Sequence, residues 1–239
     1  MRAYPNGFGS FYPAYDFDDA SLAAAGLADR RLRALSTHNI RRFPPVSSGR
    51  RMRYLTVLRD PLEQYLSYVH YMQQVQAEIA DPAFLARLPP NCASLTSREF
   101  TAWLLERPAL FAAHEGAQTT FFAEWTWRER AQNPADAAAY RRERLGVALG
   151  VLSQFALVGT VERLVESLDV LRRRATAWGF TLLPAEAVGR ENVTQTPRDD
   201  TTWIGDHDDV GRALLAALGD DRALHAYANR TLDAAAAGA

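Results

Sequence analysis

Arg59 and Ser67 are the residues of this sequence whose types and spacing best suit the binding of an anion. Arg59 follows a mostly apolar run, residues 54–58, and Ser67 lies on the helix-like stretch that begins at Pro61. A guanidinium binds a phosphate through two parallel hydrogen bonds, and a hydroxyl slightly more than two turns later can take another oxygen. We interpret the pair as half of a phosphate clamp. The alternative is that Arg59 pairs with Asp60 or a helix end while Ser67 faces solvent.

Two histidines near this pair are candidates for proton transfer. His38 ends the short strand candidate 34–38, and an imidazole titrates near neutral pH. His70 follows Ser67 by three residues, where a partly buried helix histidine bonded to the backbone is the simpler interpretation. The remaining histidines and the single cysteine are too scattered in the sequence to form a metal-ligand set: Cys92, His114, His207 and His225. We therefore expect neither a metal site nor a disulfide.

Composition limits the class of protein. The chain has 239 residues, 48% of them hydrophobic and 23% charged, which is ordinary for a globular domain. Its net charge of −1 gives no support for nucleic-acid binding. The sequence shows neither a secretory leader nor an apolar run of about 20 residues, so we expect a cytoplasmic protein without a transmembrane segment. All 27 basic residues are arginine, and every mechanism that requires a lysine of this chain is excluded.

The elements that must position these residues are strands that run directly into helices. The runs 54–58 and 155–161 are typical of buried parallel strands, and each precedes an amphipathic helical pattern. We predict an α/β fold with a mostly parallel sheet flanked by helices, in a single domain over 1–239. Residues 1–30 are expected to be an irregular segment and 233–239 a frayed tail. Ligands bind beyond the carboxyl ends of such strands, so His38 should lie at the same edge as Arg59.

The segment "TVLRDPLEQYLSYVHY" (56–71) resembles the 3′-phosphate-binding segment of sulfotransferases, a strand, Arg-Asp-Pro and a helix. The likeness is to the carbohydrate group that includes heparan sulfate 2-O-sulfotransferases and their bacterial relatives. Further segments resemble that family in the same order, so that the likeness extends over roughly 35–232: "GAQTTFFAEW" (116–125), "FALVGTVERLVESLDVLRRR" (155–174), "RENVTQ" (190–195) and "DRALHAYANR" (221–230).

The resemblance implies a P-loop-like sulfotransferase fold and a function. The donor would be 3′-phosphoadenosine-5′-phosphosulfate (PAPS), a co-substrate, and the acceptor a carbohydrate or other hydroxylated small molecule. Arg59 and Ser67 would bind the 3′-phosphate. His38 matches the family's base, although Thr37 stands where the family has a glycine.

The family's first motif, a strand followed by a Gly-rich loop with a lysine, has no clear match. "NGFGSF" (6–11) is the nearest Gly-Ser stretch, and we interpret it as a flexible N-terminal loop. The expectation is an N-terminally shortened fold with impaired transfer, in which Arg41 or Arg42 partly replaces the lysine. Two alternatives remain open: a non-catalytic nucleotide- or glycan-binding homologue, and an unrelated helical α/β protein.

Overall fold

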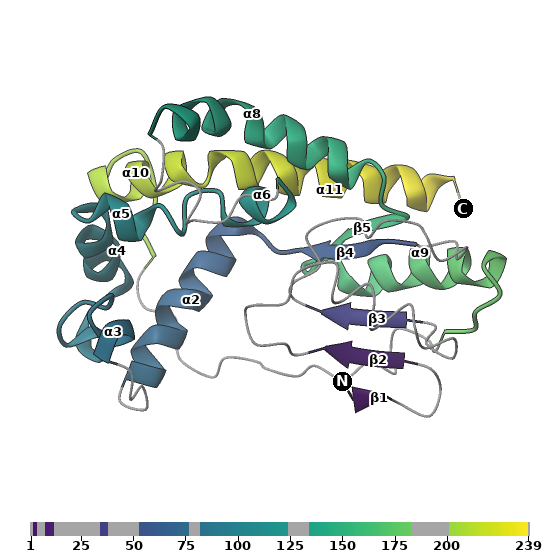
Figure 1. Ribbon diagram of the computed structural model, residues 1–239, viewed down its shortest axis with the longest axis horizontal. Helices are drawn as coiled ribbons and strands as arrows, with labels where there is room; N and C mark the ends of the chain where they lie inside the picture. The colour runs from purple at the N-terminus through teal and green to yellow at the C-terminus, as the bar shows by residue number, and fades with distance from the viewer. Residues whose placement is uncertain are drawn as a thin grey trace.

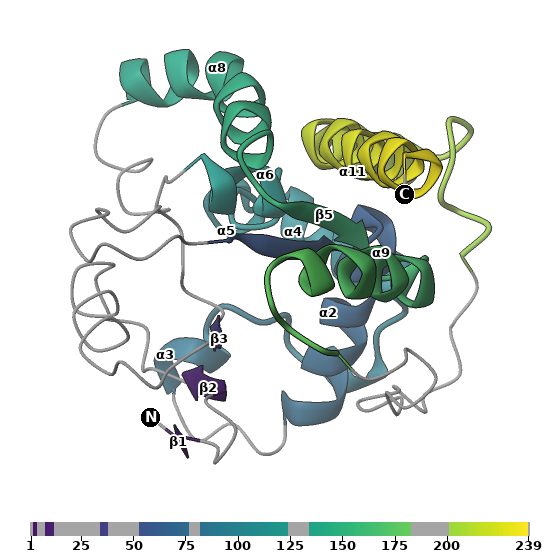
Figure 2. The same ribbon diagram turned by 90° about the vertical axis from the view of Figure 1, so that its right-hand side faces the viewer.

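The computed structural model describes residues 2–3, 8–11, 34–37, 53–76, 82–123, 134–182 and 201–238. The described part is mixed α/β and mostly helical (Figure 1). At its centre lies a parallel pair of strands, β4 (Leu55–Leu58) and β5 (Leu157–Thr160). Helices cover the pair on both sides: α8 (Pro134–Leu152) and α11 (Gly219–Ala237) lie on one face and α9 (Leu164–Ala177) on the other, as Figure 2 shows end-on.

The register of β4 and β5 confirms the prediction that 54–58 and 155–161 share one parallel sheet. Leu55 is paired with Leu157 and Leu58 with Thr160. β4 leads into α2 (Pro61–Val75), and β5 leads into α9. The residues that follow both strands, from Arg59 and from Val161, therefore lie at the same edge of the pair.

A second sheet holds β1 (Arg2–Ala3), β2 (Phe8–Phe11) and β3 (Ala34–Thr37) in that order. β2 and β3 are parallel, whereas β1 and β2 are antiparallel. The strand predicted at 34–38 is confirmed. The prediction of a flexible loop at 6–11 is wrong for 8–11, and residues 1–30 are not irregular throughout. The local sequence did not reveal β2 because its backbone partners come from β3, further along the chain.

The first hydrophobic core cluster holds α2 in place. Val69, Phe100 and Leu214 are completely buried and come from α2, from α4 (Ser97–Leu105) and from α10 (Asp209–Ala217). The capping box predicted from Thr96 and Glu99 is present at the start of α4. Shorter helices complete this side of the molecule: α3 (Pro82–Leu85), the 3-10 helix η2 (Cys92–Ser94), α5 (Pro108–Phe111) and α6 (Ala117–Phe122).

The other core clusters join the central strands to the helices. Leu58 and Val158 pack with Phe122, Leu152 and Leu224, which ties β4 and β5 to α6, α8 and α11. A smaller cluster joins Leu157, Val170 and Leu232. The strand pair is therefore anchored through side chains on both faces, and this fixes the position of its carboxyl edge.

Two expectations about burial and helix ends need correction. The strand at 54–58 is buried only in part, because Leu55 and Val57 are 43% and 42% exposed while Leu58 is 3% exposed. The helices α9 and α11 pack against β5 more closely than against β4. The tail expected to fray from 233 stays helical to Ala237, since Leu232 is fully buried and Ala235 and Ala236 pack on the same cluster.

Candidate functional site

The turn between β4 and α2 is shaped by Asp60, which caps the helix. Its carboxylate Oδ1 accepts hydrogen bonds from the backbone N–H groups of Leu62, at 2.9 Å, and Glu63, at 3.1 Å. Pro61 occupies the first helical position, where its missing N–H leaves no bond unmade. The Asp-Pro pair thus starts α2 immediately after β4 and directs the carboxylate of Asp60 at the helix end.

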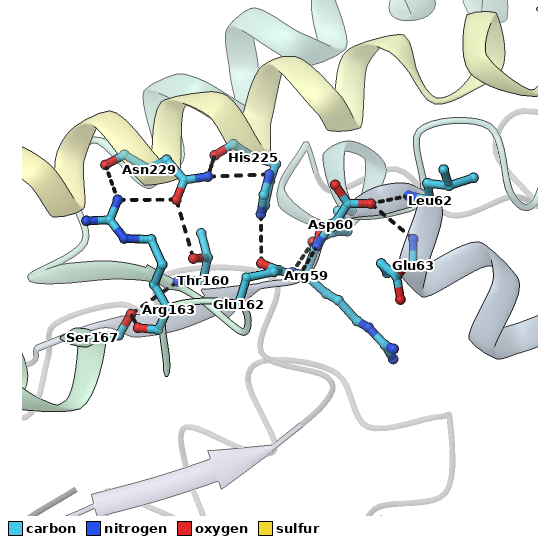
Figure 3. Close-up of polar contacts among 11 residues, drawn as sticks. Arg59, Asp60, Leu62, Glu63, Thr160, Glu162, Arg163, Ser167, His225 and Asn229 are labelled. Carbon is cyan, nitrogen blue, oxygen red and sulfur yellow. Dashed lines mark hydrogen bonds and ion pairs between the residues drawn. The ribbon is translucent and has the colours of Figure 1, made fainter. Parts of the chain in front are cut away.

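Arg59 does not pair with Asp60. Its guanidinium makes no hydrogen bond or ion pair with any residue in the described ranges. Figure 3 shows its side chain extending away from the Asp60 carboxylate and from the neighbouring Glu162 and His225. The side chain is only partly exposed. A partly buried cation with no counter-charge bound among the described residues can form charge-assisted hydrogen bonds to an anion.

The backbone of Arg59, in contrast, is held firmly. The side-chain amide of Gln118 donates from Nε2 to the Arg59 carbonyl at 2.8 Å and accepts from the Arg59 N–H at 3.2 Å. The next N–H, that of Asp60, donates to Oε1 of Glu162 at 2.8 Å. The turn is therefore fixed by side chains from α6 and from the turn after β5.

Glu162 also binds α11. Its second carboxylate oxygen, Oε2, lies 2.9 Å from Nε2 of His225. The pKa of Glu162 is lowered: partial burial raises it, but the hydrogen bonds from the Asp60 N–H and from His225 outweigh that effect. Both ring nitrogens of His225 have partners, because Nδ1 lies 3.5 Å from the amide nitrogen of Asn229. This arrangement joins elements rather than presenting a free base.

The contacts of Asn229 extend this network toward β5. The Thr160 hydroxyl donates to Oδ1 of Asn229 at 3.5 Å, and Nη1 of Arg163 donates to the same oxygen at 3.4 Å (Figure 3). Arg163 in turn forms ion pairs with Glu166 at 2.6 Å and Asp233 at 2.7 Å. Because Arg163 is engaged on several sides, Arg59 is the better candidate for binding an external anion at this edge.

Ser67 lies on α2 and is partly buried. It follows the cap residue Asp60 by nearly two turns, which places both on one stripe of the helix, about 10 Å apart along the axis. The Ser67 hydroxyl forms no hydrogen bond with any residue that the structure describes. Whether Arg59 and Ser67 meet on a single phosphate stays a prediction.

His38, the predicted base, lies outside the described residues, as do Arg41 and Arg42. The strand β3 ends at Thr37, directly before His38. His70 is buried, at 6% exposure, as its place on the apolar face of α2 favours.

Asp221 anchors α6 and with it Gln118. Its carboxylate, 2% exposed, accepts from the Gln118 N–H at 3.1 Å and the Thr119 N–H at 2.7 Å. The Thr119 hydroxyl donates to the same group at 2.6 Å. Burial raises the pKa of Asp221, although these hydrogen bonds and nearby Arg144 act in the opposite direction.

Sequence analysis missed Gln118, Glu162, His225 and Asp221 as parts of the site. All four lie in segments noted for their resemblance to a family, and His225 was otherwise considered only as a metal ligand. Their contacts join residues 59 to 103 positions apart. No local periodicity signals such contacts.

Other features of the described chain lie elsewhere or are not found. A cavity of about 180 Å³ lies at the amino end of β5, the edge opposite Arg59, and is lined in part by Phe155, Arg174 and Tyr227. Within the described ranges, no cluster of three or more histidine, cysteine or acidic residues is arranged to hold a metal ion. Nor does any helix there have the length and apolarity needed to cross a bilayer.

The comparisons with known proteins give no match. The sequence matches no protein-family model, no curated protein and no solved structure at a significant level. Its function must therefore be argued from its own residues.

Proposed function

We propose that this chain is a sulfotransferase-like protein that binds PAPS and transfers its sulfuryl group to a carbohydrate hydroxyl. The observation that carries the proposal is Arg59: a guanidinium with no partner among the described residues, just beyond the carboxyl end of a parallel strand. Ligands of open α/β sheets bind at that edge. Gln118 and Glu162 hold the backbone of Arg59 and Asp60, which fixes the position from which the arginine side chain extends.

The 3′-phosphate of the nucleotide is the group that Arg59 would bind. A charge-assisted hydrogen bond contributes about 1.5–3 kcal/mol, and the fork of a guanidinium can form two of them with one phosphate. The hydroxyl of Ser67, on the stripe of α2 that begins at the cap, would donate to a further oxygen. This pair recognises the phosphate monoester that distinguishes PAPS from ordinary adenine nucleotides.

Sulfuryl transfer would proceed by in-line attack of the acceptor oxygen on sulfur. The new S–O bond forms as the bond to the leaving 3′,5′-adenosine bisphosphate breaks, and the acceptor proton passes to a base, for which His38 is the candidate. Charge on the leaving phosphate must be neutralised. Because the sequence holds no lysine, an arginine is the candidate for this role, and we propose that sulfuryl transfer is slow.

The same absence of lysine supports a second candidate, a nucleotide- or glycan-binding homologue without catalysis. Such a protein would retain the Arg59 clamp and lack turnover. The two candidates share the binding step and differ only in transfer, so binding and transfer should be measured separately.

The test is calorimetric titration of the full chain with 3′,5′-adenosine bisphosphate and, as matched ligand, adenosine 5′-monophosphate. We expect binding of the bisphosphate, weaker binding of the monophosphate, and loss of the difference in Arg59→Ala. Arg142→Ala, which removes an exposed arginine of α8, is the control. A sulfate-transfer assay on polysaccharide acceptors separates the two candidates. If Arg59→Ala binds the bisphosphate as tightly as the wild type, the clamp is refuted.

A further inference from the structure

Gln118 binds the backbone of Arg59, the first residue after β4. The Leu58 carbonyl accepts a hydrogen bond from the Val161 N–H at 2.8 Å, so the backbone polar groups of Leu58 point toward β5. Successive backbone groups of a strand alternate in direction, and the polar groups of Arg59 therefore face away from β5. A primary amide carries one donor and one acceptor side, like a peptide group. The side chain of Gln118 uses both on Arg59, at 2.8 and 3.2 Å.

The amide of Gln118 is itself held in place from α11. Asp221 fixes the Gln118 N–H at 3.1 Å, and the Thr119 N–H at 2.7 Å, through a buried carboxylate. Next to it, Arg144 is 4% exposed and binds Asp220 at 2.6 Å and the Glu115 carbonyl at 3.1 Å. The start of α6 is thus tied to both α8 and α11. A continuous set of contacts leads from the helical layer to the backbone of Arg59.

We infer that Gln118 is a positioning residue for the Arg59 phosphate clamp, supported by Asp221, an inference that rests on the proposed function. The direction of the Arg59 side chain follows from its backbone dihedrals, and two bonds from one rigid amide hold these dihedrals. Without them, the free protein samples more orientations of the guanidinium, and binding must restrict them at an entropic cost. Gln118 acts through Arg59 and makes no contact with the nucleotide.

A double-mutant cycle tests this coupling in the full chain, with 3′,5′-adenosine bisphosphate as the probe. Gln118→Ala removes both bonds, and we expect roughly tenfold weaker binding, the equivalent of one or two net hydrogen bonds. In the Arg59→Ala background, the same substitution should cause no further loss. Gln154→Ala, at an exposed glutamine just beyond the C-terminal end of α8, is the matched control and should leave the affinity unchanged.

The outcomes separate this inference from the proposed function. No binding by the wild type, or equal binding by Arg59→Ala, overturns both. Binding that Arg59→Ala weakens but Gln118→Ala does not overturns the inference alone. So do additive losses in the double mutant, because they would show that Gln118 acts independently of Arg59.

Gln118→Glu provides a second readout that a role in folding alone would not change. An ionised glutamate cannot donate to the Arg59 carbonyl, whereas a protonated one has the donor and acceptor of glutamine and nearly its shape. The affinity of Gln118→Glu relative to wild type at the same pH should therefore recover as the pH falls toward about 4.3, the ordinary glutamate pKa. A ratio that stays constant with pH, in protein whose thermal unfolding shows it to be folded, contradicts the inference.

Discussion

Glu162 and His225 form a side-chain pair that connects the turn after β5 to the middle of α11. Oε2 of Glu162 lies 2.9 Å from Nε2 of His225, while Oε1 accepts from the Asp60 N–H at 2.8 Å. One carboxylate therefore connects three segments of the chain. Disturbing it should affect the stability of the edge at which Arg59 lies.

Glu162→Gln should lower the free energy of unfolding by about 1 kcal/mol at pH 7, a modest value because the carboxylate is partly exposed. The pKa of Glu162 is lowered on folding, so its contribution is present above the unfolded value of about 4.5 and is lost as the pH falls through the folded value. Urea unfolding at pH 7 and pH 3.5 should show the difference shrinking. Glu143→Gln, at an exposed position of α8, is the control. An equal difference at both pH values contradicts the assignment.

Arg59→Lys should separate binding from stability. The guanidinium makes no hydrogen bond or ion pair with a described residue, so its replacement should change the free energy of unfolding by less than about 0.5 kcal/mol. Lysine keeps the charge but loses the two-pronged geometry, and affinity for 3′,5′-adenosine bisphosphate should fall roughly tenfold, as for one lost charge-assisted bond. In calorimetry, the affinity should decrease from the wild type to the lysine variant and from the lysine to the alanine variant. A lysine variant that binds as well as the wild type would show that the fork geometry is not used.

His114 should make the protein less stable in mild acid. Its ring lies 4.4 Å from the Tyr68 ring and 5.7 Å from the Tyr65 ring, between centroids, and burial lowers its pKa from 6.5 to about 4. The unfolded chain therefore binds this proton first, and stability falls between pH 6.5 and 4 by up to about 3 kcal/mol. Thermal unfolding of His114→Phe should show a flatter profile over this range. His207→Phe, at an exposed histidine, should keep the slope of the wild type.

Gly159→Ala should disturb the packing of β5 on α9. A Cβ atom at this position would lie 2.5 Å from Oγ and 2.7 Å from Cβ of Ser167, and overpacking of this kind costs about 1–3 kcal/mol. Adding Ser167→Gly removes the opposing atoms, so the double variant should be more stable than the sum of the single losses predicts. Gly150→Ala is the matched control: no atom lies within 4 Å of its Cβ position, and it should stabilise α8 by up to about 1 kcal/mol. If Gly159→Ala unfolds at the same urea concentration as the wild type, this close approach is not as described.

Elements with strong local signals were predicted well. Pro61 after an Asp at a strand end, and the Thr96–Glu99 box, fix helix starts through bonds within a few residues. β5 was predicted as a longer run, 155–161, than the strand that forms, Leu157–Thr160. β2 was missed and the burial of Leu55 and Val57 was overestimated, because both depend on which segments lie alongside.

The sequence by itself determined that an apolar strand would end just before Arg59 and that Asp60 and Pro61 would start a helix after it, since these effects act between neighbours along the chain. Only the tertiary structure decided what surrounds this turn. The amide of Gln118, 59 residues from Arg59, and the pair of Glu162 and His225, 63 residues apart, meet at one edge through the packing of α6, α8 and α11 on the central strands. A hydrogen bond acts only over a short distance, so residues this far apart in the sequence can form one only after the core has brought the donor and the acceptor together.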